Sequence, residues 1–307
     1  MSDFNVKFRG VRGSFPVADK NFLKFGGNTS CVEVNAGGRL IILDAGTGIV
    51  SLGNEMTQKH IASSVNPKDR TPCSALILLS HIHIDHLLGL AFFNPLHIKS
   101  SKIKLYGSGS HDSSIEQALK ELVFGKGHPL DLEVVACQFD INELVEGCGI
   151  LIKPEKEPEL VRLDNVIPNE NDILITFYQS YTHPNDAVMI YRISYKGKSL
   201  VYATDKECCL GGDNKFCSFA KDCDLLIHDA QYITEDYFSL YNPKQGFGHS
   251  TYDMAIEAMK QSRAQNIIFY HYDPNYDDTK LSMIEERYAL NAKNIQMAYE
   301  GLEFEIF

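Results

Sequence analysis

A histidine-rich segment that directly follows an apolar run constrains this chain more than any other feature. The run SALILLS (74–80) is largely apolar, as in a strand buried on both faces, and HIHIDH (81–86) follows it. Imidazole and carboxylate side chains are common ligands of transition metals. A polar turn would account for one such residue, but not for a ligand type at four of six positions. The segment therefore predicts a metal site built on His81, His83, Asp85 and His86.

The spacing within this segment indicates two neighbouring cations rather than one. Strand side chains alternate between two faces, so His81 and His83 are expected to point the same way. Asp85 and His86 follow where we expect the chain to turn into a helix that carries LLGLAFF (87–93). The two histidines would then hold one ion, and the Asp–His pair the other.

Three further strand-like runs end close to a ligand type. They lead to His183 after DILITFYQS (172–180), to Asp205 at the end of SLVYATD (199–205), and to His271 in NIIFYHYD (266–273). Sites of open α/β sheets assemble at the carboxyl ends of strands. We therefore expect two coordination spheres with Asp205 bridging them: one contains His81, His83 and His183, and the other contains Asp85, His86 and His271.

The order of the runs predicts the fold class. Apolar runs alternate with helical patterns such as 111–125 and 250–265, the second with Ser250 as its expected N-cap. Strands that alternate with helices predict an α/β protein. We expect a single domain over 1–307. Its least regular part, 126–171, would be an insertion or a hairpin arm beside the active site.

Charge and hydropathy restrict the partners. The net charge of −11 disfavours bulk nucleic-acid binding, which depends on Lys and Arg contacts to phosphates. No apolar stretch has the length of a membrane helix or a signal peptide. We therefore expect a cytoplasmic protein without membrane contact, whose eight cysteines are thiols. The sequence leaves the oligomeric state open, with a homodimer as one option.

With these residues in view, the sequence resembles the metallo-β-lactamase superfamily, whose signature is H-x-H-x-D-H. The resemblance covers nearly the whole chain. It implies an αββα sandwich, in which two mixed sheets are flanked by helices. The segment ILDAGTG (42–48) is similar to a family element whose aspartate orients the metal loop, and that role falls on Asp44. Metal-ligating histidines usually donate their other N–H to an acceptor, for which Asp44 and Asp229 are candidates.

Two segments resemble the phosphodiesterase-like branch of that superfamily, which includes the tRNA 3′-processing endonucleases and the cyclic phosphodiesterases of phosphonate metabolism. They are the glycine-rich opening (8–34) and the stretch from GFGHSTYDM to the last ligand (246–274). In those relatives a His-Ser-Thr segment precedes a helix, as it does here at 249–251. The resemblance implies that His249 lies near the scissile phosphate, as a proton donor or a phosphate contact.

On this reading the chain is a dinuclear-metal-dependent hydrolase. It would hold two divalent transition-metal ions (Zn, Fe or Mn) and cleave a phosphodiester through a metal-bridging hydroxide. The expected catalytic residues are Asp85, which would bind a metal and orient the hydroxide, and His249. The acidic charge and the lack of an evident tRNA-clasping arm favour a small-molecule substrate, a phosphodiester or cyclic nucleotide, over tRNA.

A non-hydrolytic alternative stays open on the same scaffold. Flavodiiron proteins resemble this chain in fold, and a stand-alone di-iron centre would bind, reduce or sense dioxygen. Two observations disfavour it: their signature has Glu where this chain has His83, and no flavodoxin domain follows in this sequence. Thioester or lactone hydrolysis also fits the metal motif, although it fits the His-Ser-Thr segment less well.

Overall fold

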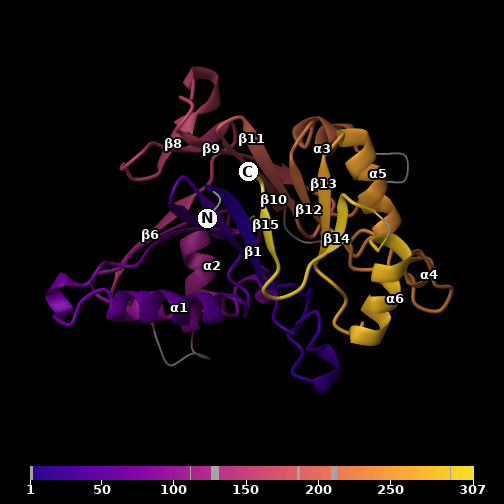
Figure 1. Ribbon diagram of the computed structural model, residues 1–307, viewed down its shortest axis with the longest axis horizontal. Coiled ribbons are helices and arrows are strands. Elements are labelled where there is room, and N and C mark those ends of the chain that lie inside the picture. Colours follow the sequence, from indigo (N-terminus) through magenta and orange to yellow (C-terminus); the bar gives the residue numbers. More distant parts are fainter. Residues whose placement is uncertain (1–2, 111, 126–130, 185–186, 209–212, 291) are drawn as a thin grey trace.

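Two β-sheets lie between two layers of helices (Figure 1). The computed structural model describes residues 3–110, 112–125, 131–184, 187–208, 213–290 and 292–307. The first and last strands of the described chain are paired, with Asn5 opposite Glu305, so both ends belong to the same sheet.

Among the described residues the first sheet has seven strands, in the order β15-β1-β2-β3-β4-β5-β6. Its strands from β3 to β6 are parallel, and the others are antiparallel. The strands are β1 (Phe4–Gly10), β2 (Cys31–Ala36), β3 (Arg39–Leu43), β4 (Ser74–Leu78), β5 (Lys102–Gly107), β6 (Gln138–Glu143) and β15 (Glu303–Glu305).

The second sheet has eight strands within the described ranges, in the order β14-β13-β12-β11-β10-β9-β7-β8. The block from β11 to β14 is parallel, and the rest is antiparallel. The strands are β7 (Cys148–Ile152), β8 (Glu159–Arg162), β9 (Ile173–Ser180), β10 (Val188–Tyr195), β11 (Lys198–Ala203), β12 (Leu225–Asp229), β13 (Asn266–Tyr270) and β14 (Ile295–Met297).

Alternation along each strand explains the layers. In β3, Ile41 and Leu43 belong to the core shared by the two sheets, whereas Ile42 packs in a separate apolar cluster with α1 (Ile49–Ala62) and α2 (Ile115–Leu122). The other helices are α3 (Asn214–Phe219), α4 (Thr234–Tyr237), α5 (Tyr252–Ser262) and α6 (Asp278–Tyr288). In Figure 1, α1 and α2 lie on one side of the strands, and α3, α5 and α6 lie on the other. The predicted αββα sandwich is confirmed.

Two local predictions are wrong. LLGLAFF (87–93) does not form an α-helix: it contains a 3₁₀ helix at Leu90–Phe92 and lies between two others at Ile84–His86 and Asn94–His97. The Gly89 N–H donates to Ala45 O (3.0 Å), so the backbone bonds across to another segment instead of continuing an α-helix. Helix α5 is capped by Thr251 rather than Ser250, whose hydroxyl donates to Lys206 O (2.6 Å).

The segment predicted as an insertion, 126–171, supplies strands to both sheets in its described part. Strand β6 ends the first sheet, and β7 and β8 lie at one edge of the second. Residues 126–130 lie outside the described residues, and the division of the chain into domains stays a prediction. None of the helices in the described ranges is long and apolar enough to cross a membrane.

Candidate metal centre

The seven residues expected as ligands lie together where strands of both sheets end. The histidine-rich segment follows β4 of the first sheet, and the remaining ligands follow β9, β11 and β13 of the second. Their nitrogen and oxygen atoms form two groups of four, and within each group the atoms lie within 4.8 Å of one another. The groups are His81, His83, His183 and Asp205, and Asp85, His86, Asp205 and His271.

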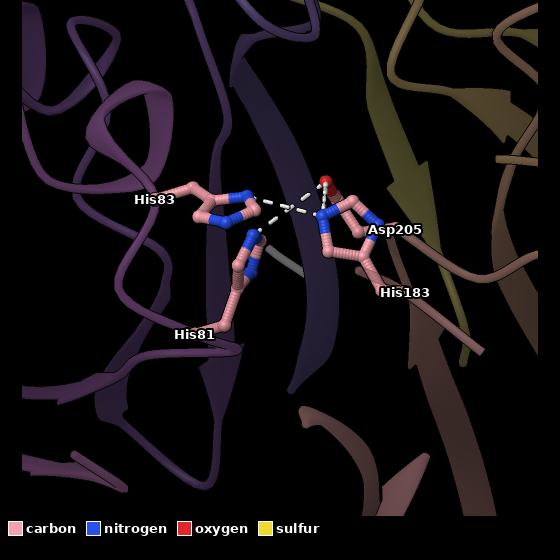
Figure 2. Close-up of side chains that lie close together, drawn as sticks. All are labelled: His81, His83, His183 and Asp205. Atoms are coloured by element: carbon pink, nitrogen blue, oxygen red, sulfur yellow. Dashed lines mark hydrogen bonds and ion pairs between the residues drawn. The ribbon is translucent and has the colours of Figure 1, made fainter. Parts of the chain in front are cut away.

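The side chains of the first group come from three segments of the chain and point toward one another (Figure 2). His183 Nε2 lies 3.0 Å from His83 Nδ1. Asp205 Oδ2 lies 3.6 Å from His81 Nε2 and 3.8 Å from His183 Nε2. Three imidazoles and one carboxylate oxygen therefore surround a common centre.

The second group uses the other oxygen of Asp205. Asp205 Oδ1 lies 3.1 Å from His271 Nε2 and 3.2 Å from His86 Nε2. Asp85 Oδ2 lies 3.2 Å from each of the same two nitrogens. Burial alone would raise the pKa of Asp205, but the imidazoles of His271, His86 and His81 hold it well below its usual value. Asp205 is thus the carboxylate that both groups share.

Left-handed backbone places several of these side chains. Asp44, Asp205 and His271 have φ values of 61°, 48° and 64°, and each lies one or two residues beyond the end of a strand. Such conformations are uncommon for residues other than glycine and cluster at functional sites. They turn each side chain out of the strand direction and toward the centre.

Asp44 orients His86, as the sequence indicated. It is fully buried, and its Oδ2 accepts from His86 Nδ1 (2.8 Å) and from the Tyr202 hydroxyl (2.7 Å). Ser80 also binds this carboxylate: its N–H donates to Asp44 Oδ1 (2.6 Å), and its hydroxyl donates to Asp44 Oδ2 (2.9 Å). With Nδ1 occupied in this way, the Nε2 atom of His86 faces the second group.

Asp229, the other candidate acceptor, does not orient His271. Asp229 Oδ2 is 3.8 Å from His271 Nδ1, whereas Gln231 Oε1 is 3.1 Å away. The sequence did not predict a role for Gln231. Nor did it predict the contact of Ser14, whose N–H donates to Asp85 Oδ2 (2.8 Å). Amides and backbone donors are too common in sequences to stand out, although Gln231 lies only two residues beyond the strand that ends at Asp229.

His249 lies against both groups without belonging to either. Its ring centroid is 5.1 Å from that of His271 and 5.0 Å from that of His183. Its Nδ1 lies 2.7 Å from Asp229 Oδ2. Burial alone would lower the pKa of His249, but the Asp229 carboxylate raises it to about 9. Asp229 therefore favours the protonated form of the imidazole.

The donor set fits transition-metal ions. His81 Nε2 is buried and makes no hydrogen bond among the described residues, although it points into the first group. Burial is the main cause that holds the pKa of His81 well below its usual value, and the neighbouring His86 lowers it further. The imidazole is therefore neutral, and its lone pair is available. Neutral imidazoles and ionised carboxylates are the forms in which these side chains bind metals.

Comparison with known sequences decides the family. The profile described as Beta-lactamase superfamily domain matches residues 39–272. The chain belongs to this superfamily. As a superfamily member with this donor set, the protein is a metal-dependent hydrolase with a centre for two divalent metal ions. Ribonuclease Z of Picrophilus torridus is 24% identical over 99% of this chain and 96% of its own, which confirms the resemblance to the tRNA 3′-endonuclease branch.

Solved structures show the same fold. A diphosphatase from the PhnP family superposes with a TM-score of 0.63 at 17% identity, covering 98% of this chain and 97% of its own. The short form of human tRNase Z superposes with a TM-score of 0.57 at 18% identity and covers 99% of both chains. At these identities the likeness is one of fold.

The similarity to ribonuclease Z contradicts the prediction of a small-molecule substrate and no bulk nucleic-acid binding. That prediction relied on the net charge of −11, which is a sum over the whole chain. Four of the acidic side chains are buried within or beside the centre, where imidazoles and metal ions offset their charge. They are Asp44, Asp85, Asp205 and Asp229. A sum over the whole chain does not locate charge, so it does not exclude contact between an RNA and one part of the surface.

Proposed function

We propose that this chain is a dinuclear-metal-dependent phosphodiesterase that cleaves RNA, with precursor tRNA as its substrate. The similarity to ribonuclease Z along 99% of the chain carries the choice of RNA. In the proposal, Asp205 is shared by two ions, one held with His81, His83 and His183, the other with Asp85, His86 and His271. When bound, the two ions supply a nucleophile at neutral pH and neutralise negative charge on the attacked phosphate.

The chain's own groups position the reactants and move the proton. Asp85 Oδ2 is held by the Ser14 N–H, so it faces the centre in one orientation. His249 is held through Nδ1 by Asp229, which leaves Nε2 to face the substrate. Because the Asp229 carboxylate favours the protonated imidazole, Nε2–H would donate its proton to the leaving oxygen as the P–O bond breaks.

The direct test of this function uses an unmodified precursor tRNA with a 3′ trailer. We expect the metal-loaded protein to release the trailer and to leave the mature tRNA body intact, as read on a denaturing gel. Cleavage should stop when the metal is removed by a chelator and return when Zn²⁺ or Mn²⁺ is restored. Hydrolysis of bis(p-nitrophenyl) phosphate without any cleavage of the precursor would contradict the proposal. So would a purified protein that develops visible absorption in air and cleaves neither substrate.

Replacement of His249 by alanine should slow RNA cleavage by about 10²–10⁴-fold, the usual contribution of a general acid. The effect on bis(p-nitrophenyl) phosphate should be smaller, because p-nitrophenolate leaves without being protonated. Metal content, measured by mass spectrometry, should stay at the wild-type value.

The control for this variant is the same substitution at His97, an exposed histidine. It should change neither rate. Loss of bound metal from His249→Ala would show that His249 is a ligand. An equal loss of rate on both substrates, with the metal retained, would show that it contacts the phosphate and is not the acid.

A further inference from the structure

The loop of residues 238–248 carries a lysine to the edge of the centre. It connects α4 to His249 and includes highly exposed apolar side chains at Leu240 and Tyr241. Its end is fixed by Glu207, whose carboxylate oxygens accept from Gly246 N (2.8 Å) and Gly248 N (2.9 Å). The part of the loop next to His249 therefore has a defined position.

Lys244 is half-buried in this loop and is held by aromatic faces. Its Nζ lies 5.3 Å from the centroid of the Phe247 ring and 5.8 Å from that of Tyr232. Tyr232 is buried, and its ring centroid is 6.0 Å from that of His249. The ammonium group is thus one aromatic ring away from the imidazole that the proposed reaction uses.

No carboxylate of the described residues lies within salt-bridge distance of Lys244 Nζ, in contrast to Lys206, which pairs with Asp213 at 2.7 Å. Aromatic faces attract a cation without cancelling its charge. The charge of Lys244 is therefore available to an anionic ligand beside the centre.

Phe247 adds a second element of recognition. It lies two residues before His249, and about half of its side chain is exposed (49%). An exposed ring beside a lysine without a carboxylate partner is the combination that binds single-stranded nucleic acid, in which the cation contacts a phosphate and the ring stacks on a base. The ring and the ammonium group are neighbours, close enough to contact one nucleotide.

We propose that Lys244 and Phe247 form a nucleotide subsite on the His249 side of the centre. This proposal rests on the function proposed above. The subsite takes one nucleotide of single-stranded RNA on the leaving-group side of the cleaved bond. Lys244 binds its phosphate, and Phe247 stacks on its base. Glu207 is a positioning residue, because it fixes the loop that carries both groups.

The test is equilibrium binding of a fluorescent single-stranded oligoribonucleotide to the metal-loaded protein, followed by anisotropy at several salt concentrations. The RNA is checked for integrity on a gel after each reading. Lys244→Met should reduce the slope of log Kd against log salt by about 0.7, the value for one phosphate contact in single strands. Lys244→Arg should restore the slope.

Phe247→Leu should weaken binding by roughly 5- to 150-fold, which corresponds to one stacked base, with the salt slope unchanged. Phe247→Tyr should bind as the wild type does. The matched control is Lys59→Met, at an exposed lysine of α1. Thermal unfolding should show that all variants are folded.

The results separate this subsite from the proposed function. Suppose that the wild type cleaves precursor tRNA, and that Lys244→Met and Phe247→Leu bind RNA as tightly as Lys59→Met does. This result would overturn the subsite and leave the proposed function unaffected. A wild type that neither binds the oligoribonucleotide nor cleaves the precursor would overturn both.

Discussion

Asp205→Asn is expected to remove at least one of the two metal ions and to lower phosphodiester hydrolysis by at least about 10³-fold, since a two-metal site contributes several kcal/mol. The reason is the shared carboxylate: Oδ1 faces His86 and His271, and Oδ2 faces the other group. Asparagine is neutral and offers one oxygen and one NH₂ donor, so both groups lose the negative charge and one of them also loses its oxygen. Metal per protein, measured by mass spectrometry, and the hydrolysis of bis(p-nitrophenyl) phosphate are the two readings.

The chain offers a closely matched control for this substitution. Asp222 also has left-handed backbone (φ 54°, against 48° at Asp205), but it is exposed and pairs with Arg263. Asn tolerates this backbone as Asp does. Asp222→Asn should therefore keep both ions and the full rate, because exposed ion pairs contribute little. Two bound ions and an undiminished rate in Asp205→Asn would refute the bridging role.

Asp44→Asn is expected to lower the free energy of unfolding of the metal-free protein by roughly 2–4 kcal/mol, since buried donors would lose their acceptor. Four donors converge on this carboxylate, from Ser80, His86 and Tyr202. An asparagine NH₂ group would face one of them as a second donor. Metal affinity should also fall by about 10–100-fold, because His86 would no longer be held with Nε2 toward the ion.

Denaturant unfolding in the presence of a chelator measures the first effect, and metal titration measures the second. Tyr202→Phe is the comparison variant, because it removes one donor to Asp44 (2.7 Å) and leaves the contact with His86 in place. It should cost about 1 kcal/mol and leave metal affinity near the wild-type value. Equal unfolding midpoints for Asp44→Asn and the wild type would contradict this account.

The fold class and the positions of the expected ligands were predictable because both depend on local patterns. Apolar runs located strands β4, β9, β11 and β13, and a ligand type followed each of them. Carboxyl ends of parallel strands meet at one edge, so His183, Asp205 and His271 were expected to lie beside the histidine-rich segment. The structure brings them together, while their roles as ligands stay a prediction.

Other features had no local signal. The turn after the histidine-rich segment consists of 3₁₀ helices because Gly89 bonds to Ala45, a partner more than forty residues earlier in the chain. Gln231 rather than Asp229 orients His271, a choice that depends on atomic distances of 3.1 and 3.8 Å. Net charge pointed away from nucleic acid because it does not separate buried carboxylates from those on the surface.

The sequence by itself determined the kind of centre, because imidazole and carboxylate are properties of single side chains and their spacing after apolar runs places them at strand ends. Only the tertiary structure decided how those groups are used: the division of the Asp205 oxygens between two clusters, the pairing of Asp229 with His249, and the contact of Tyr232 with both Lys244 and the same imidazole. These outcomes depend on competition among hydrogen-bond and ring contacts from segments far apart in the chain, and such competition exists only once both sheets have packed.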